Sequence, residues 1–167
     1  KELEAELSGL AKQLSGTMRC LVHRDLQSQN VMIRDGEPFL IDFQGMRFGS
    51  PFYDLGSLLC DPYVDFSENE RDELLFFYYG LRSQTGGEFH WTNFHNSFWE
   101  ASAQRLMQCL GAYGFLGHRK GLNTYLEHVP AGLHRLRLAT MRVSSLPKLH
   151  ELSLSCQRAI ENKGGYL

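Results

Sequence analysis

Leucine residues at helical spacing begin the chain. They recur every three or four positions, the positions between them are mostly polar, and Gly16 follows the last of them. The residues concerned are Leu3, Leu7, Leu10 and Leu14. This periodicity predicts an amphipathic helix over residues 3–14 that ends at Gly16.

The pattern then changes to short apolar runs. Two runs of β-prone residues, 31–33 and 39–41, flank the sequence Asp35-Gly36-Glu37-Pro38. An Asp-Gly pair between such runs is typical of a β-hairpin turn. A short apolar run over residues 20–22 is expected to be a buried strand, and a polar loop over residues 23–30 joins it to this hairpin. We therefore expect a small β-hairpin that is preceded by a polar loop.

From residue 50 onward the pattern is helical. Ser50-Pro51 has the form of a cap followed by a proline in the first turn, and Ser67 with Glu70 has the form of a capping box. The helix after this capping box is expected to end at Gly86-Gly87.

Three further segments complete the prediction. A helix is expected over residues 91–113, a glycine-rich break over 114–121, and helices that begin near Pro130 and Pro147. The chain is thus predicted to be mainly α with a small β-hairpin, an α+β fold. We expect residues 1–167 to form a single domain.

Composition narrows the classes of function. The 167 residues are 43% hydrophobic and 12% aromatic, which is enough to build a core. Lys and Arg number 17 and Asp and Glu number 19, a net charge of −2, so we expect no nucleic-acid partner. The longest apolar run, 74–79, is far shorter than a membrane span, so we expect no membrane partner either.

The cysteines indicate a compartment. They show no C-x-x-C pair, and their wide separation fits neither a zinc site nor a dense disulfide framework. We expect them to be reduced thiols in a cytoplasmic protein. They are Cys20, Cys60, Cys109 and Cys156.

The candidate chemistry lies in the polar loop and just after the hairpin. Asp25 and Asn30 stand five positions apart in the loop, and Asp42 follows the second run of the hairpin. This arrangement can place two oxygen atoms on a hard cation and leave one carboxylate free to accept a proton. Such a layout suits phosphoryl transfer.

These residues resemble a known pair of motifs. The segment from His23 to Asn30 resembles the H-x-D-x-x-x-x-N catalytic loop of the protein-kinase-like superfamily, and Asp42-Phe43 resembles its D-F-G-type metal site. The resemblance implies that ATP is the phosphoryl donor, that Asp25 is the catalytic base, and that Asn30 and Asp42 bind Mg²⁺. It gives His23 a structural role, in which it packs against the loop.

Departures from the protein-kinase pattern identify a branch of this superfamily. Ser50-Pro51 begins a helix eight residues after Asp42, which leaves no room for the peptide platform of a protein kinase. Gln27 stands where those enzymes have Lys, and Gln44 where they have Gly. The segment Tyr53-Asp54-Leu55 resembles the Y-D-L helix start of the aminoglycoside phosphotransferase and choline-kinase-like family. By this resemblance, Asp54 supports the catalytic loop from beneath.

A narrower resemblance concerns the acceptor. Together with the loop, residues 104–107 and 111–115 are similar to bacterial cell-wall amino-sugar kinases, which phosphorylate N-acetylmuramate or N-acetylglucosamine. The resemblance implies a small-molecule hydroxyl substrate, an amino sugar.

The chain resembles only the C-terminal lobe of such a kinase. It contains no glycine-rich phosphate loop and no lysine in a V-A-I-K context. We therefore expect the N-terminal, nucleotide-binding lobe to lie upstream in the same gene product, and these 167 residues alone not to turn over ATP. An exposed apolar surface is expected where that lobe packs, through which the isolated lobe could form a homodimer.

Several alternatives accompany this interpretation. A retained kinase lobe could act as a non-catalytic interaction module. Asp61 and Asp65 could contact substrate, although capping or solvating a turn is favoured. A group of aromatic residues could line a sugar pocket, although their helical spacing favours a core; these are Trp91, Phe94, Phe98, Trp99 and Tyr113.

Overall fold

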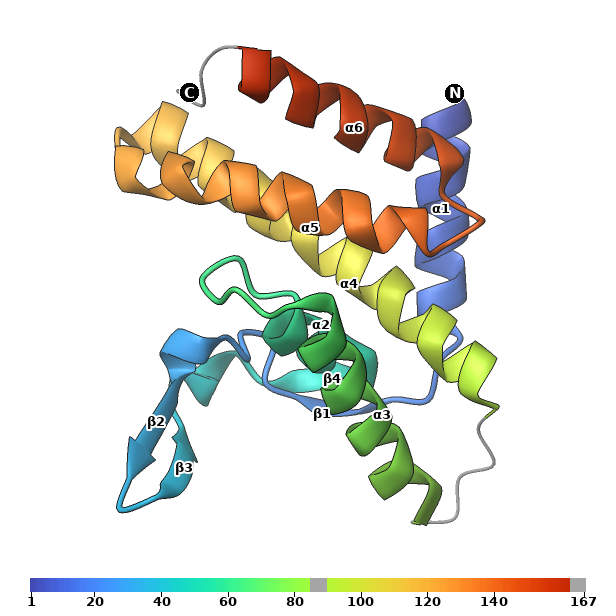
Figure 1. Cartoon of the computed structure of the whole chain (residues 1–167), viewed down its shortest axis with the longest axis vertical. Helices are drawn as coiled ribbons and strands as arrows, with labels where there is room; N and C mark the ends of the chain where they lie inside the picture. Colours follow the sequence, from blue (N-terminus) through green and yellow to red (C-terminus); the bar gives the residue numbers. More distant parts are fainter. Residues whose placement is uncertain (85–89, 163–167) are drawn as a thin grey trace.

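The computed structural model describes residues 1–84 and 90–162 and is mainly helical, with two short pairs of antiparallel strands (Figure 1). The prediction of a mainly α chain with a small hairpin is confirmed. The predicted helix end at Gly86-Gly87 lies outside the described residues. No helix in the described part has the length and apolarity that a membrane span requires.

The hairpin forms where the sequence predicts it. Strand β2 (Val31–Arg34) pairs with β3 (Glu37–Leu40) in antiparallel register, and Asp35 and Gly36 form the connection. Both connecting residues have positive φ, 53° and 82°, as a two-residue type I′ turn requires.

In a second strand pair, the strand over residues 20–22 was predicted and its partner was not. Strand β1 (Cys20–Val22) pairs with β4 (Arg47–Gly49), so that the chain leaves the first helix, passes through the polar loop and the hairpin, and returns beside β1. Strands of three residues are too short to give a periodic signal. This pair holds the two ends of the 23–46 segment together.

The predicted helices are present. They are α1 (Glu2–Ser15), α2 (Pro51–Leu59), α3 (Glu68–Gln84), α4 (Trp91–Gly114), α5 (Val129–Met141) and α6 (Pro147–Asn162). The capping box before α3 is confirmed, because the Ser67 hydroxyl and the Glu70 carboxylate each bond the backbone N–H of the other residue. Ser50 occupies the N-cap position of α2, but its hydroxyl makes no capping bond.

The predicted break over 114–121 is confirmed only at its end. The chain continues from α4 through a π-helical turn (Phe115–Arg119), and the reversal occurs at Gly121, whose φ is 73°. A 3-10 segment (Asn123–His128) then leads into α5. Gly117 serves close packing rather than a break, since a Cβ there would lie 2.3 Å from Leu126 Cδ2.

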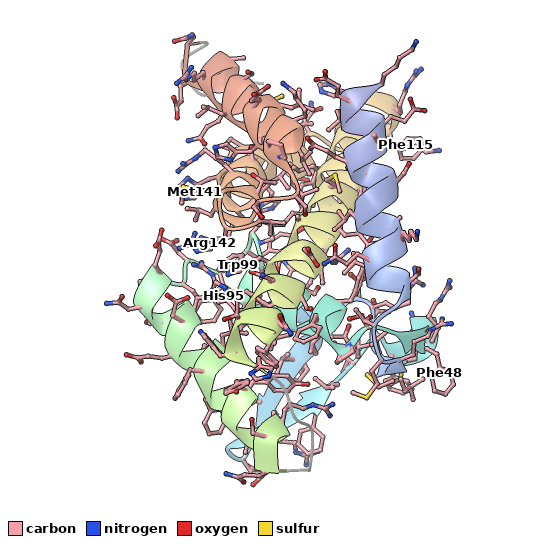
Figure 2. The ribbon with its side chains drawn as sticks, turned by 90° about the vertical axis from the view of Figure 1, so that its right-hand side faces the viewer. Phe48, His95, Trp99, Phe115, Met141 and Arg142 are labelled. Carbon is pink, nitrogen blue, oxygen red and sulfur yellow. The ribbon has the colours of Figure 1, made fainter. Side chains whose placement is uncertain are left out.

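Helix α4 is the centre of the core. It packs against α2 on one side and α5 on the other. Four of its five aromatic residues are buried and Trp91 is partly buried against the core cluster, which confirms the core interpretation over a sugar-lined pocket. Trp99 is held between two neighbours: its Nε1 donates to His95 Nε2 (2.9 Å), and the Arg142 guanidinium lies 4.7 Å from its ring centroid (Figure 2).

Helix α6 is tied to α1 by a carboxylate. Glu6 accepts hydrogen bonds from the backbone N–H groups of Lys148 (2.8 Å) and Leu149 (3.1 Å), the first-turn donors of α6. A negative charge at this end of a helix is favourable. The first and last helices of the described chain therefore lie together, as Figure 1 shows.

The strand segment carries a concentration of exposed apolar side chains. The hairpin projects from the helical part, at the end away from α6 (Figure 1). Ten large apolar residues between positions 18 and 48 are at least 40% exposed. This set, called below the exposed apolar region, is Met18, Leu21, Met32, Ile33, Phe39, Leu40, Ile41, Phe43, Met46 and Phe48.

Candidate active site

The start of the polar loop is fixed by the first turn of α2. The Asp54 carboxylate accepts hydrogen bonds from the backbone N–H groups of His23 (2.5 Å) and Arg24 (2.8 Å). The buried His23 ring places Nε2 2.9 Å from the carbonyl oxygen of Ile41, next to Asp42. Arg24 has a φ of 77°, a left-handed conformation that costs energy and that these bonds hold in place.

The end of the loop is held by a second carboxylate, Asp61. This side chain is 1% exposed and accepts hydrogen bonds from both the backbone N–H and the hydroxyl of Ser28, each at 2.8 Å. It also accepts from the N–H of Tyr63 (3.0 Å), so it caps its own turn as expected. Its contact with the loop was not predicted. Asp65 lies elsewhere, paired with Arg135 at 3.2 Å.

Asp25 forms an ion pair with a residue of α4. Arg105 Nη2 lies 2.6 Å from Asp25 Oδ1, and Arg105 Nε donates to the Ser57 hydroxyl of α2 (3.1 Å). The Arg105 side chain is 11% exposed, whereas that of Asp25 is 51% exposed. The other Asp25 oxygen accepts no hydrogen bond from the described residues. It can therefore accept a proton from a hydroxyl placed before it.

Buried neutral groups surround this ion pair. Burial raises the pKa of the Tyr53 hydroxyl and of the Cys109 thiol, both of which lie beside Arg105. Both groups are therefore uncharged near neutral pH. Asp25 is the one carboxylate in ion-pair contact with Arg105 within the described chain.

Asn30 and Asp42 supply oxygen atoms at the far side of the loop. Asn30 Nδ2 donates to the backbone carbonyl of Asp25 (2.9 Å), so its amide oxygen remains available as an acceptor. The Asn30 carbonyl accepts from Ile41 N–H (3.0 Å), which ties the loop to the strand end that precedes Asp42. Asp42 is exposed, has a φ of 62°, and accepts a hydrogen bond from Gln44 Nε2.

The donor set of Asn30 and Asp42 fits Mg²⁺. One amide oxygen and one carboxylate are hard ligands of the kind that this ion takes, with phosphate oxygens and water completing its shell. No group of three or more His, Cys, Asp or Glu side chains in residues 1–84 and 90–162 could hold a metal by itself. The site thus fits a metal that arrives with a phosphate-bearing ligand.

Sequence reasoning missed two residues of this site, Arg105 and Asp61. Arg105 lies in the 104–107 segment that carries the amino-sugar kinase resemblance, but no motif links it to Asp25, 80 positions earlier. For Asp61, the sequence showed only that a carboxylate follows the helix that carries Asp54, and this did not indicate a contact with the loop.

Comparisons with known proteins agree with these motifs. The Phosphotransferase enzyme family matches residues 1–91, a segment that holds Asp25, Asn30, Asp42 and Asp54. An N-acetylmuramate/N-acetylglucosamine kinase of Neisseria meningitidis serogroup B is 30% identical over 133 residues, 78% of this chain and 40% of that protein. Proteins of the same description from Pseudomonas aeruginosa and Pseudomonas putida are 29% and 28% identical, over 86% and 83% of this chain. The chain spans about two fifths of the length of these relatives.

Proposed function

Because the chain belongs to the phosphotransferase enzyme family, we propose that it is the catalytic and acceptor-binding part of an ATP-dependent kinase for a small-molecule hydroxyl. The observation that carries this proposal is the half-exposed Asp25 carboxylate, held by Arg105 through one oxygen and free at the other. The names of the relatives support an amino sugar as the acceptor.

The proposed reaction uses Asp25 as the base. Its free oxygen takes the proton of the acceptor hydroxyl while the acceptor oxygen bonds to the γ-phosphorus of ATP. The bond from that phosphorus to the bridging oxygen breaks, and ADP leaves. Arg105 keeps the carboxylate oriented. Asn30 and Asp42 would hold Mg²⁺, which neutralises charge on the phosphates.

The rest of the enzyme is proposed to come from the same gene product. A nucleotide-binding lobe that packs on the exposed apolar region would remove its ten side chains from water, a favourable change. On this proposal the 167 residues alone do not turn over ATP. The four free cysteines are in keeping with a cytoplasmic enzyme.

The test is phosphoryl transfer by the full-length gene product. We expect Mg-ATP with N-acetylmuramate or N-acetylglucosamine to give ADP and a sugar phosphate, and Asp25→Asn to slow this by about 100-fold or more. Asp35→Asn is the matched control, since Asp35 is an exposed turn residue with a positive φ that Asn also tolerates.

Three results would contradict parts of the proposal. Full activity in Asp25→Asn would show that Asp25 is not the base. A folded protein that binds Mg-ATP but phosphorylates neither sugar would have another acceptor. A folded protein that binds no nucleotide would favour the non-catalytic interaction module.

A further inference from the structure

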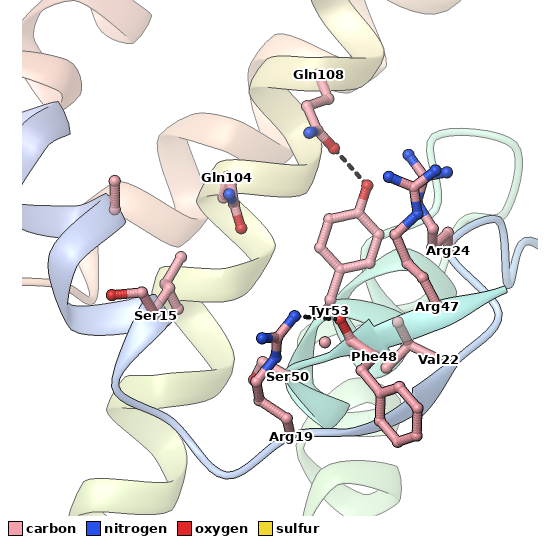
Figure 3. Close-up of a pocket in the computed structure, with 13 residues that line it drawn as sticks. Ser15, Arg19, Val22, Arg24, Arg47, Phe48, Ser50, Tyr53, Gln104 and Gln108 are labelled. Atoms are coloured by element: carbon pink, nitrogen blue, oxygen red, sulfur yellow. Dashed lines mark hydrogen bonds between the residues drawn. The ribbon is translucent and has the colours of Figure 1, made fainter. Parts of the chain in front are cut away.

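A recess is lined by Tyr53, whose ring also faces Arg105 of the Asp25 ion pair. It is bounded by the end of α1, the β1–β4 pair, the start of α2 and the middle of α4, and it has a volume of about 430 Å³ (Figure 3). Three arginine side chains line it: Arg19, Arg24 and Arg47. No carboxylate is among its lining residues. We call it the arginine recess.

No carboxylate of the described residues neutralises the three guanidinium groups. Arg19 donates to the Phe48 carbonyl (2.8 Å) and Arg24 to the Gly45 carbonyl (3.4 Å), whereas Arg47 makes no side-chain hydrogen bond in the described structure. None of the three is in an ion pair with a described carboxylate. Like charges gathered around one recess repel each other, and a bound anion would remove that cost.

Neutral hydrogen-bond donors line the same recess. The Ser50 hydroxyl at the N-terminus of α2 is buried and has no partner in the described structure. Gln108 accepts from the Tyr53 hydroxyl through Oε1, which leaves its NH₂ group as a donor (Figure 3). Guanidinium groups, a hydroxyl and a helix N-terminus together form the donor set that recognises an oxyanion.

We propose that the arginine recess binds the carboxylate or phosphate group of a small molecule. Its position links it to catalysis, because Arg24 directly precedes Asp25 and the Tyr53 ring lies 5.8 Å below the Arg105 guanidinium. Two sources share this chemistry: the carboxylate of an acidic sugar acceptor, which rests on the proposed function, and a free phosphate-bearing metabolite, which does not.

The two sources can be separated with a matched pair of sugars. N-acetylmuramate carries a lactyl carboxylate that N-acetylglucosamine lacks, and inorganic phosphate represents the second source. Each would be titrated into the full-length gene product by calorimetry without ATP. The variant is Arg47→Gln, because this exposed side chain makes no bond that the fold needs. The control is Arg34→Gln, an exposed hairpin arginine outside the recess.

We expect Arg47→Gln to weaken the binding of an oxyanion by about 10-fold, and Arg34→Gln to leave it unchanged. Arg47→Lys, which keeps the charge, should retain much of the affinity. A loss for N-acetylmuramate with none for N-acetylglucosamine identifies the acceptor carboxylate as the ligand. A loss for phosphate with neither sugar affected identifies a metabolite site.

The proposal is overturned by either of two results. In the first, the wild-type protein binds no phosphate and holds N-acetylmuramate no more tightly than N-acetylglucosamine. In the second, Arg47→Gln and Arg34→Gln weaken binding equally, which indicates general charge attraction. These measurements involve no phosphoryl transfer, so failure here leaves the Asp25 test unaffected, and a failed Asp25 test leaves the metabolite site standing.

Discussion

At the scale of single residues, Asp25 and the loop around it are held by side chains distant in sequence. Arg105 reaches Asp25 from α4, Asp54 reaches the loop start from α2, and Asp61 reaches its end. Each contact fixes either the Asp25 carboxylate or the backbone beside it. A base must lie within hydrogen-bond reach of the proton that it removes, so these supports set the efficiency of the proposed reaction.

Arg105→Lys tests this support. Lysine keeps the charge but cannot bond Asp25 and Ser57 at once, so the carboxylate loses its orientation. We expect kcat to fall by about 10-fold or more with little change in the KM for ATP. Steady-state kinetics of the full-length gene product measure both values.

The control for this variant is Arg137→Lys. Arg137 is a part-buried arginine on α5 whose Nε donates to the neutral Gln157, and it has no contact with the loop. Its kcat should be unchanged. An Arg105→Lys enzyme with unchanged kcat, or with an equal change in the control, would show that the ion pair does not position Asp25.

The residues differ in how far sequence alone could identify them. Asp25, Asn30 and Asp42 lie within one short segment, so their spacing can be recognised without knowing the fold; their chemical roles stay predictions. Arg105 contacts Asp25 from 80 positions away in the sequence, and Asp61 contacts Ser28 from 33 positions away. Contacts between residues so far apart in the sequence depend on how the helices pack, and hydrophobic periodicity does not reveal that packing.

At the scale of elements, the contact between α2 and α4 determines the geometry of the candidate active site. Gly56 of α2 lies against Ser102 of α4, and a Cβ at position 56 would lie 2.6 Å from Ser102 Oγ and 3.0 Å from its Cα. One residue beyond Gly56 is Ser57, which bonds Arg105. The close approach of the two helices therefore determines where Arg105 stands.

Two Gly→Ala substitutions test this packing. Gly56→Ala forces the helices apart, and we expect it to lower the free energy of unfolding by about 1–3 kcal/mol. Gly111→Ala lies in exposed helix with nothing within 4 Å of the new Cβ, and should raise that free energy by about 1 kcal/mol. Chemical denaturation measures both. Equal stabilisation by the two substitutions would show that α2 and α4 do not require the glycine.

Elements with a strong local signal were predicted well. The α1 periodicity, the Asp35-Gly36 turn and the capping box at Ser67 each combine several local preferences, and all three are confirmed. Strand β1 was predicted, but its partner β4 was missed because three residues give no periodic signal. The break expected over 114–121 occurs only at its end, at Gly121, because Gly117 accommodates Leu126 rather than a turn.

At the scale of the whole molecule, the polar and apolar surfaces are distributed unevenly. The helices bury the core, whereas the strand segment carries the exposed apolar region. Apolar surface of this extent is typical of an interface. The proposed nucleotide-binding lobe would cover it, and a second copy of the chain could cover it when the 167 residues are produced alone.

We therefore expect the 167-residue chain to self-associate. Sedimentation velocity should show a larger species that grows with protein concentration. The double variant Ile33→Lys with Phe48→Lys changes two of the most exposed side chains, 67% and 65%, and should sediment as a monomer. Phe77→Lys, 66% exposed on α3 and outside the region, is the control. A wild-type chain that stays monomeric at all concentrations would contradict this expectation.

The 80-residue separation of Asp25 and Arg105 also bears on biosynthesis. The hairpin joins neighbours in sequence and can form as soon as its strands are made, whereas the Asp25 ion pair must wait until α4 has been translated. A nascent chain that stops just before Arg105 already contains Asp25, Asn30, Asp42 and Asp54. It lacks the cation that holds the proposed base, so on the ribosome the residues of the motif are complete before Asp25 gains its ion-pair partner.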